Sequence, residues 1–392
     1  MSPGRVLVGE GSSASCADEL KAIGVLPVHG RVLLVADGTV LGLNLHRPLL
    51  QSLETAGYTV HIGPGVSAEP TLETVRSLLP HDSTAPISVV IGFGGGSALD
   101  AAKLASAAAA NDIDLTAGIT PSADIVPGPP ILAVPTTAGT GAEATAVAML
   151  WHDNSKRMFV HPYLVPRVVL IDPELLTALP QSVTAAGGFD AIGHAIESML
   201  STFRTPLTAA AARDALQVLA WSVPEAYGTG SRSARYGTAV GAYQAGLALN
   251  ASVVLGHSLA YAVASRTGLP HGTTVAMTLP YCLAHARQVS ESTIAEIAHI
   301  VCGESDPALL VKWIVDTSAR MNIPGSLAEL GVTVDELSAI ATDCVENYPR
   351  PNHPVPIDHA GVLALLEHMH TGEPLQAWND AAQPATHSEA LA

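Results

Sequence analysis

Short apolar runs rich in β-branched residues alternate with Ala- and Leu-rich runs through the first part of the chain. Runs of the first kind indicate buried strands, and runs of the second kind indicate helices. Strands that alternate with helices favour a parallel sheet with helices on both faces. The predicted strands are residues 31–37, 58–63, 87–92, 131–135 and 168–172, and the predicted helices between them include residues 46–57 and 100–111.

The pattern changes after Pro180, where long Ala/Leu helical runs such as TAAAARDALQVLAWSV (208–223) follow with few β-branched stretches. A chain of 392 residues is long enough for two domains. We therefore predict an α/β domain over residues 1–180 and an all-helical domain over residues 181–392. The tail NDAAQPATHSEALA is small and polar, and we expect it to be frayed.

Charge and composition exclude several classes of protein. The formal net charge of −17 argues against a nucleic-acid or anionic-membrane partner, because binding phosphates needs a basic face. The start lacks the apolar region of a signal peptide, and no run of about 18 apolar residues suggests a membrane span. The cysteines show no CxxC spacing and fit reduced thiols in a cytoplasmic protein. They are Cys16, Cys282, Cys302 and Cys344.

A glycine-rich loop stands between a predicted strand and a predicted helix in IGFGGGSALDAAK (91–103). Ser97 is placed to cap that helix, and Asp100 falls at the third position of a pattern similar to a capping box. The amides of such a loop, together with the helix N-terminus, form a pocket for phosphate. The same glycines also suit a tight turn that requires positive φ.

Two further strand ends carry residues suited to a dinucleotide. Asp37 ends the strand 31–37, where a carboxylate can accept a hydrogen bond from a ribose 2′-OH and would repel a 2′-phosphate. This favours NAD over NADP, although the Asp-Gly-Thr sequence also suits a plain turn. The loop VPTTAGTGAE (134–143) offers hydroxyls and amides that fit either a cofactor edge or ordinary turn chemistry.

Histidines and an aspartate in the second half have the spacing of metal ligands. Asp190 and His194, in GGFDAIGHAIESMLS, lie one helical turn apart on the same face. His257 and His271 follow downstream, fourteen residues apart. Three imidazoles and one carboxylate suit Fe²⁺ or Zn²⁺ and leave a position open for substrate. Glu197, one turn beyond His194, either supports these ligands or faces away from them.

In combination, these motifs resemble the iron-containing (group III) alcohol dehydrogenase family over nearly the whole chain. The resemblance implies an N-terminal Rossmann-like α/β dinucleotide domain, an all-α C-terminal domain of dehydroquinate synthase-like architecture, and a site in the cleft between them. The matching segments are GGGSALDAAK (94–103), PTTAGTGAE (135–143), residues 156–162 with IDPEL (171–175), FDAIGHAIE (189–197) and GHSLAYAVASRTGLPHG (256–272).

The resemblance also implies a role for each matching residue. The pyrophosphate of NAD(H) would lie on Gly94, Gly95, Gly96 and Ser97, and the adenosine ribose on Asp37. Other cofactor contacts would come from Asp100, Thr136, Thr137 and Thr140, with Lys156 near the nicotinamide ribose. The metal ligands would be Asp190, His194, His257 and His271, and the reacting groups would meet Tyr261 and His271.

Three positions depart from the family pattern. Many members have a second histidine where this chain has Tyr261, and a tyrosine with an ordinary pKa near 10 is a poor proton relay at neutral pH. The alternative roles for Tyr261 are to shape the pocket or to donate a hydrogen bond. Ala142 replaces the usual serine and removes a hydroxyl. Gly193, inside the ligand helix, is either a close-packing point or a local weakness.

We therefore predict an NAD(H)-dependent, metal-assisted alcohol dehydrogenase that acts as an aldehyde or ketone reductase and forms a homodimer or larger homo-oligomer. One alternative is maleylacetate reductase, which commonly lacks the full ligand set. Another is a reductase of a small anionic aldehyde such as phosphonoacetaldehyde, with Arg266 as the candidate cation. A dehydroquinate-synthase-like lyase would need a more basic pocket. A non-enzymatic nucleotide-binding role is the last alternative.

Overall fold

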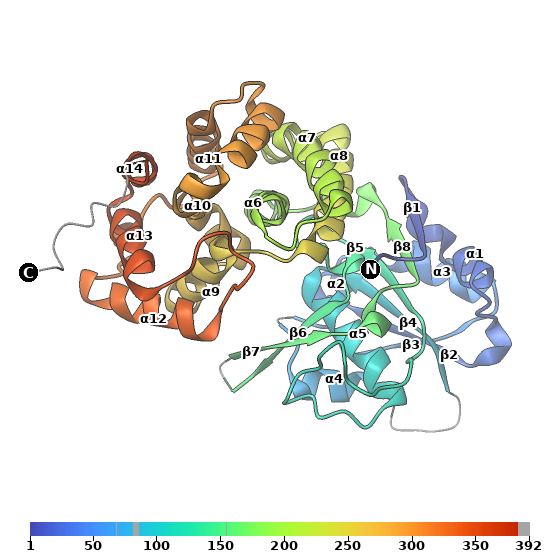
Figure 1. Cartoon of the computed structure of the whole chain (residues 1–392). Helices are drawn as coiled ribbons and strands as arrows, with labels where there is room; N and C mark the ends of the chain where they lie inside the picture. Colours follow the sequence, from blue (N-terminus) through green and yellow to red (C-terminus); the bar gives the residue numbers. More distant parts are fainter. Residues whose placement is uncertain (68, 81–85, 154, 383–392) are drawn as a thin grey trace, which may run out of the picture. The chain divides into compact units, whose positions relative to one another are not determined.

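The computed structural model describes residues 1–67, 69–80, 86–153 and 155–382 and divides into two units. The first unit comprises Met1–Leu179 and Gly230–Leu247, and the second comprises Pro180–Thr229 and Ala248–Ala392 (Figure 1). The chain first changes unit beside the expected boundary. Helix α8 (Arg232–Ala248), which the sequence analysis had assigned to the helical domain, packs mainly with the first unit because Ala239 and Tyr243 join the core of its sheet.

The first unit is built on a six-stranded parallel sheet with strand order β1-β8-β5-β4-β2-β3. Its strands are β1 (Arg5–Val8), β2 (Arg31–Ala36), β3 (Thr59–Ile62), β4 (Ile87–Gly94), β5 (Ile131–Pro135) and β8 (Val168–Ile171). The predicted strands match β2, β3, β4, β5 and β8. Edge strand β1 was not predicted from the sequence, nor was the antiparallel hairpin of β6 (Val147–His152) and β7 (Ser155–Val160).

Alternate residues of the central strands fill two separate cores. Leu33 and Val35 pack with helix α5 (Gly96–Ala110) on one face of the sheet. Leu34 and Ile91 pack on the other face with residues of α1 (Cys16–Ala22) and α3 (Arg47–Thr55). Because both faces are covered, these strands appear in the sequence as continuous apolar runs rather than as alternating ones.

The order of the strands reverses between β2 and β4. The chain passes from β2 to its neighbour β3 on one side, whereas β5 follows β4 on the other side. In open parallel sheets, ligands bind at the carboxyl ends of the strands beside such a reversal. Asp37 follows β2, Gly94 ends β4 and Thr136 follows β5, so the three predicted cofactor loops start from this one edge.

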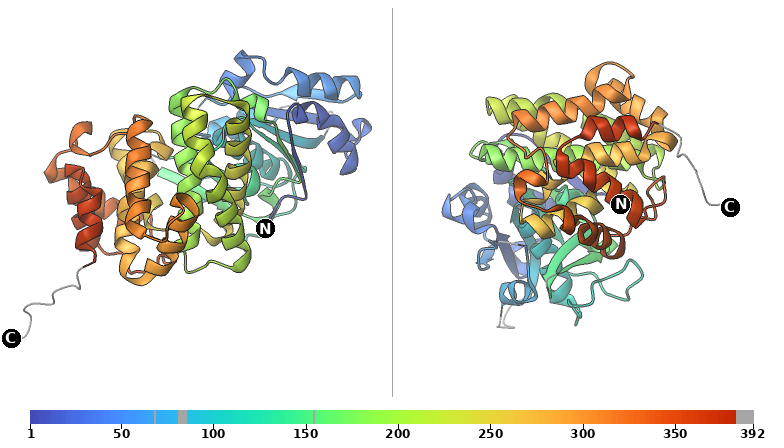
Figure 2. Two further views of the ribbon diagram at one scale, coloured as in Figure 1. Left: turned by 90° about the horizontal axis from the view of Figure 1, so that it is seen from above. Right: turned by 90° about the vertical axis from the view of Figure 1, so that its left-hand side faces the viewer.

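The second unit is helical, and its longest described helix packs against several others. Helix α10 packs against α6, α9 and α11 (Figure 2). The bounds are α6 (Gln181–Leu200), α7 (Pro206–Gly228), α9 (Leu255–Thr267), α10 (His271–Cys302), α11 (Pro307–Arg320), α12 (Leu337–Asn347), α13 (His359–Thr371) and α14 (Pro374–Asp380).

Two glycines allow α6 and α10 to approach closely. A Cβ atom added to Gly193 would lie 2.5 Å from Val275 Cγ1, and one added to Gly272 would lie 1.9 Å from the Ala186 carbonyl oxygen. Neither distance is compatible with a side chain. Of the two roles left open for Gly193, the structure supports close packing.

The four cysteines are free thiols, in agreement with the absence of a disulfide framework from the sequence. No single helix among the described residues is long and apolar enough to cross a membrane. Helices α8 and α9 meet that requirement of length and composition only when they are taken together as a bent pair.

A buried lysine ties helix α5 to the chain that leads into the hairpin. Lys103 Nζ donates to the carbonyl oxygens of Thr145, at 3.0 Å, and Val147, at 2.6 Å, and to Thr145 Oγ1 at 3.2 Å. Burial lowers the pKa of Lys103 to about 8, against the opposing effect of Asp100 and Glu143. The motif that contains this lysine gave no indication of its structural role.

Replacing Lys103 with methionine should destabilise the first unit. The substitution removes the donor from three acceptors and leaves the carboxylates of Asp100 and Glu143 without their neighbouring cation, so we expect a loss of about 3 kcal/mol. Chemical unfolding followed by circular dichroism measures it. The control is Lys312→Met, which removes an exposed pair with Asp316 and should change stability by less than about 0.5 kcal/mol. Equal unfolding midpoints for the two variants would contradict the assignment.

Candidate metal and cofactor sites

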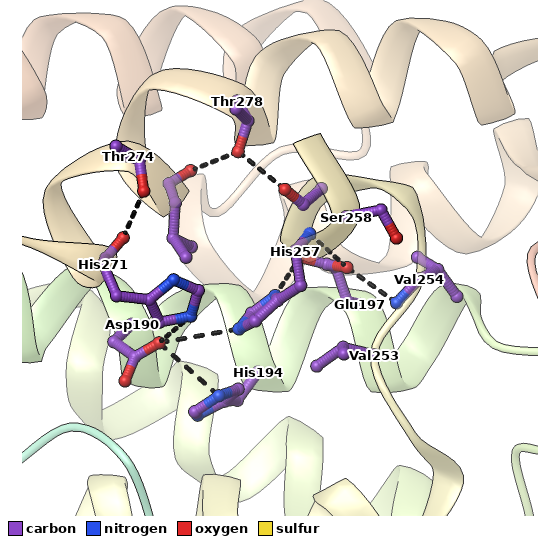
Figure 3. A network of polar contacts seen from close by, with 12 residues as sticks. Asp190, His194, Glu197, Val253, Val254, His257, Ser258, His271, Thr274 and Thr278 are labelled. Atoms are coloured by element: carbon purple, nitrogen blue, oxygen red, sulfur yellow. Dashed lines mark hydrogen bonds and ion pairs between the residues drawn. The ribbon is translucent and has the colours of Figure 1, made fainter. Parts of the chain in front are cut away.

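The four predicted metal ligands come together in the helical unit (Figure 3). Asp190 and His194 lie one turn apart on α6, His257 lies on α9, and His271 is the first residue of α10. Asp190 Oδ1 is 3.5 Å from His194 Nε2, 3.5 Å from His257 Nε2 and 3.7 Å from His271 Nε2. Three helices therefore direct imidazoles toward one carboxylate oxygen.

This arrangement fits a cation. Asp190, His257 and His271 each offer one ligand atom, and these atoms lie within 4.8 Å of one another. His194 Nε2 approaches the same aspartate oxygen but lies outside that tighter group. Among the described residues, no hydrogen bond satisfies the buried atoms Asp190 Oδ1 and His257 Nε2. Buried polar atoms without hydrogen bonds are uncommon and are explained where an ion binds.

The electrostatics of the cluster also require positive charge beside Asp190. Burial would raise the pKa of Asp190, but the neighbouring histidines, His194 above all, hold that pKa below its usual range. Burial would lower the pKa of His257, but Glu197 and Asp190 raise it to about 9. The aspartate is therefore an anion whose compensating charge is either a proton on an imidazole or a metal ion.

Glu197 holds His257 in place. Its carboxylate is fully buried, lies 2.6 Å from His257 Nδ1, and accepts hydrogen bonds from the backbone N–H groups of Val254, at 2.7 Å, and His257, at 3.2 Å. A carboxylate on one ring nitrogen orients the other nitrogen toward a metal. The structure thus supports the first of the two roles that the sequence left open for Glu197.

Aromatic rings surround the same cluster. Tyr261 stacks on His271 with ring centroids 4.6 Å apart and planes within 7° of parallel, and its ring lies edge-to-face with that of His257 at a centroid distance of 6.3 Å. Tyr348 packs on Tyr261 at 5.1 Å. The structure thus brings the predicted pair Tyr261 and His271 into contact. Tyr348 was not predicted as part of this site, because nothing in the spacing of YPRPN (348–352) relates it to α9.

In the first unit, the glycine loop contacts the other two predicted cofactor loops. A Cβ atom added to Gly94 would lie 2.9 Å from Asp37 Cβ, and one added to Gly96 would lie 2.8 Å from Thr140 Cγ2. At Gly95 it would lie 3.3 Å from Thr137 Oγ1. Glycine therefore allows three strand ends to converge, whether or not a ligand binds there.

The predicted capping box at the start of α5 was wrong. The helix begins at Gly96 with Gly95 as its N-cap, and no side chain caps it. Because Gly95 is the N-cap, Ala98 occupies the third helical position and Asp100 lies two residues beyond the place of the partner residue. The Asp100 carboxylate instead accepts a hydrogen bond from Met149 N of β6 at 3.1 Å. The helix start therefore lacks a capping side chain and resembles the anion-binding starts of other helices.

Three further charged residues have partners in the protein. Asp37 Oδ1 accepts hydrogen bonds from Thr39 N and Val40 N and so caps the short helix α2 (Gly38–Gly42). Lys156, on β7, pairs with Glu69 at 2.5 Å, and its side chain is 18% exposed. Arg266 pairs with Glu336.

Comparison with known proteins places both units in one family. Residues 3–173 match the family model of iron-containing alcohol dehydrogenase, and residues 184–370 match the C-terminal model of the Fe-containing alcohol dehydrogenase family. Long-chain-alcohol dehydrogenase 1 of Geobacillus thermodenitrificans is 32% identical over 376 residues, which cover 92% of this chain and 93% of that protein. Lactaldehyde reductase of Escherichia coli is 27% identical over 353 residues, which cover 86% and 91%.

Solved structures agree with the sequence matches. A 1,3-propanediol oxidoreductase superimposes with a TM-score of 0.86 at 28% identity, covering 94% of this chain and 98% of its own. An alcohol dehydrogenase from Oenococcus oeni gives a TM-score of 0.86 at 26% identity, covering 94% and 99%. The family matches span both units, and the chain belongs to the iron-containing alcohol dehydrogenase family.

Proposed function

We propose that this member of the family is an NAD(H)-dependent, divalent-metal-assisted enzyme that interconverts small alcohols with their aldehydes or ketones. The observation that carries the proposal is the convergence of His194, His257 and His271 on Asp190 Oδ1. Relatives with the names NAD-dependent methanol dehydrogenase and lactaldehyde reductase support the same class of reaction.

The proposed metal ligands are Asp190, His194, His257 and His271. A divalent ion bound there would polarise a carbonyl oxygen, or lower the pKa of an alcohol, and so favour hydride transfer to or from nicotinamide. The chain contributes the ligand geometry, and Glu197 orients His257 through Nδ1. The donor set suits Fe²⁺ or Zn²⁺, and the family name favours iron.

The proposed cofactor site is the edge where β2, β4 and β5 end. The pyrophosphate would bind at the uncapped start of α5, on Gly94, Gly95, Gly96 and Ser97. Asp37 would accept from the adenosine ribose while it continues to cap α2. Thr136, Thr137 and Thr140 would line the cofactor. Lys156 near the nicotinamide ribose remains a proposal, and its pair with Glu69 supplies a competing partner.

We propose a cytoplasmic homodimer or larger homo-oligomer. The free thiols support a reducing compartment. Leu207 and Trp221 on α7 are 83% and 50% exposed in the single chain, which supports burial against another subunit. Light scattering of the purified protein measures the assembly.

The alternative activities have less support. The complete ligand set counts against maleylacetate reductase. Arg266, the candidate cation for an anionic aldehyde, is engaged by Glu336. A lyase acting on a phosphorylated acid needs free cations, but Lys103 is buried within the first unit and Lys156 is paired. Turnover of an aldehyde with NADH would exclude a purely non-enzymatic role.

Replacing Asp190 with asparagine should remove the metal and the activity together. We expect near one metal per chain in the parent protein and less than about 0.1 in the variant, with NADH-dependent aldehyde reduction reduced more than about 100-fold, because the anion that holds the ion is lost. Metal analysis and NADH oxidation on the same sample measure both. Asp316→Asn, at an exposed pair on α11, is the control and should match the parent. Full turnover by chelated, metal-free parent protein would overturn the proposal.

Replacing Asp37 with asparagine should relax the preference for NADH over NADPH. Asparagine can still accept the hydrogen bonds that cap α2, so this variant removes the charge and keeps the cap. We expect the ratio of kcat/KM for NADH to that for NADPH to fall by about 10-fold, which corresponds to about 1.4 kcal/mol of repulsion.

The comparison variant is Asp37→Ala, which loses the charge and the cap together. It should show the same change in cofactor ratio as Asp37→Asn, with an additional loss of stability of about 1 kcal/mol. If both variants keep the parent's cofactor ratio, Asp37 is a helix cap and not a cofactor residue.

A further inference from the structure

We propose that Tyr261 is a positioning residue for the metal ligand His271, and that it acts through the stacking of its ring on the imidazole. The inference rests on the metal site proposed above and adds a residue that orients one of its ligands. It assigns Tyr261 a role in metal binding, distinct from the proton relay or pocket-shaping roles considered from the sequence.

The geometry of the two rings supports this role. Their planes are within 7° of parallel and their centroids are 4.6 Å apart, which is a stacked pair. Tyr261 follows His257 by one helical turn on α9, so the residue that presents one ligand is followed on the same face by the ring that contacts another. His271 belongs to α10, and the stack therefore joins two helices at the metal site.

The need for such a contact follows from how the other ligands are held. The carboxylate of Glu197 orients His257, whose side chain is 1% exposed. His194 stacks on His257 with centroids 4.8 Å apart and planes at 21°. The His271 side chain is 23% exposed, so its packing restrains it least of the three.

Several contacts hold the backbone of His271, but these contacts do not set the orientation of its imidazole ring. Gly272 lies against the carbonyl of Ala186, and Thr274 Oγ1 donates to the His271 carbonyl at 2.7 Å. These contacts hold the start of α10 and leave the two side-chain torsions of His271 to be set by what touches its ring. The His257 ring meets it edge-to-face at 5.2 Å, and the face of Tyr261 supplies the stacked contact.

Tyr348 supports Tyr261 from another element. Its ring lies 5.1 Å from the Tyr261 ring at a tilt of 37°. The Tyr348 carbonyl accepts a hydrogen bond of 2.6 Å from Ser258 Oγ, which ties this segment to α9 one turn before Tyr261. Tyr261 is thus in contact with Tyr348 as well as with His271, and its ring has little freedom to turn away from the imidazole.

The proposal is tested by metal binding rather than by turnover alone. Full-length protein is stripped of metal and titrated anaerobically with Co²⁺ in competition with a chromophoric chelator, and the visible absorption of bound Co²⁺ reports the ligand geometry. The variants are Tyr261→Ala, Tyr261→Leu and Tyr261→Phe. Leucine fills space without a ring that stacks, and phenylalanine keeps the ring without the hydroxyl.

We expect Tyr261→Ala and Tyr261→Leu to bind Co²⁺ about 10-fold more weakly and to change its spectrum, as the loss of a contact to a ligand typically does. Tyr261→Phe should bind within about twofold of the parent, with the parent's spectrum. The matched control is Tyr227→Ala, which removes another half-buried tyrosine of the same unit, on α7, whose hydroxyl accepts a hydrogen bond from Asn322. It should leave Co²⁺ binding unchanged.

Three results would overturn the inference. Parent-like Co²⁺ affinity in Tyr261→Leu would show that the stack does not position His271. Equal losses in Tyr261→Phe and Tyr261→Leu would assign the effect to the hydroxyl. A loss in Tyr227→Ala as large as in Tyr261→Leu would mark a general effect on folding, which thermal unfolding of the metal-free variants measures directly. If the parent protein does not bind Co²⁺, the proposed metal site itself is wrong. If Asp190→Asn abolishes Co²⁺ binding and Tyr261→Leu retains it, only the proposed role of Tyr261 is wrong.

Discussion

The carboxylate of Asp190 inside the helical unit is the constraint on which much of this structure depends. A buried anion is costly unless positive charge lies beside it, and here three imidazoles from α6, α9 and α10 approach one of its oxygens. The helices can deliver them only by packing closely, and Gly193 and Gly272 are the places where α6 and α10 come too near for a side chain. The helices that place imidazoles beside Asp190 are therefore also the helices that must pack closely.

In the first unit, glycines also allow close approaches, and there they bring loops and helices of the α/β unit together. Gly96 accommodates the side chain of Thr140, and Gly141 lies against Gly246 of α8, where a Cβ on Gly141 would be 2.5 Å from the Gly246 Cα atom. These approaches bring the threonine loop over the start of α5 and bind α8 to the α/β unit. In both units, therefore, these glycines allow close approaches that a side chain would prevent.

Much of the fold follows from local pattern. The strands 31–36, 87–94 and 131–135 are continuous apolar runs because helices cover both faces of the sheet, and such runs are visible without a structure. Strand β1 was missed because its four residues, Arg5–Val8, are too short a run to be told apart from a loop by pattern alone. Helix α8 was assigned to the wrong neighbours because its Ala- and Gly-rich sequence resembles that of the helices beside it and says nothing about the surface on which Ala239 and Tyr243 pack.

The sequence by itself determined the strand–helix alternation, the glycine loop and the pairing of Asp190 with His194, because each depends on residues within one or two turns of one another. Only the tertiary structure decided which contacts hold those residues. Glu197 meets His257 across 60 residues of chain, Tyr261 stacks on His271 of the next helix, and Arg266 pairs with Glu336. Such pairs are set by how helices pack and not by their spacing along the chain, so no local period records them.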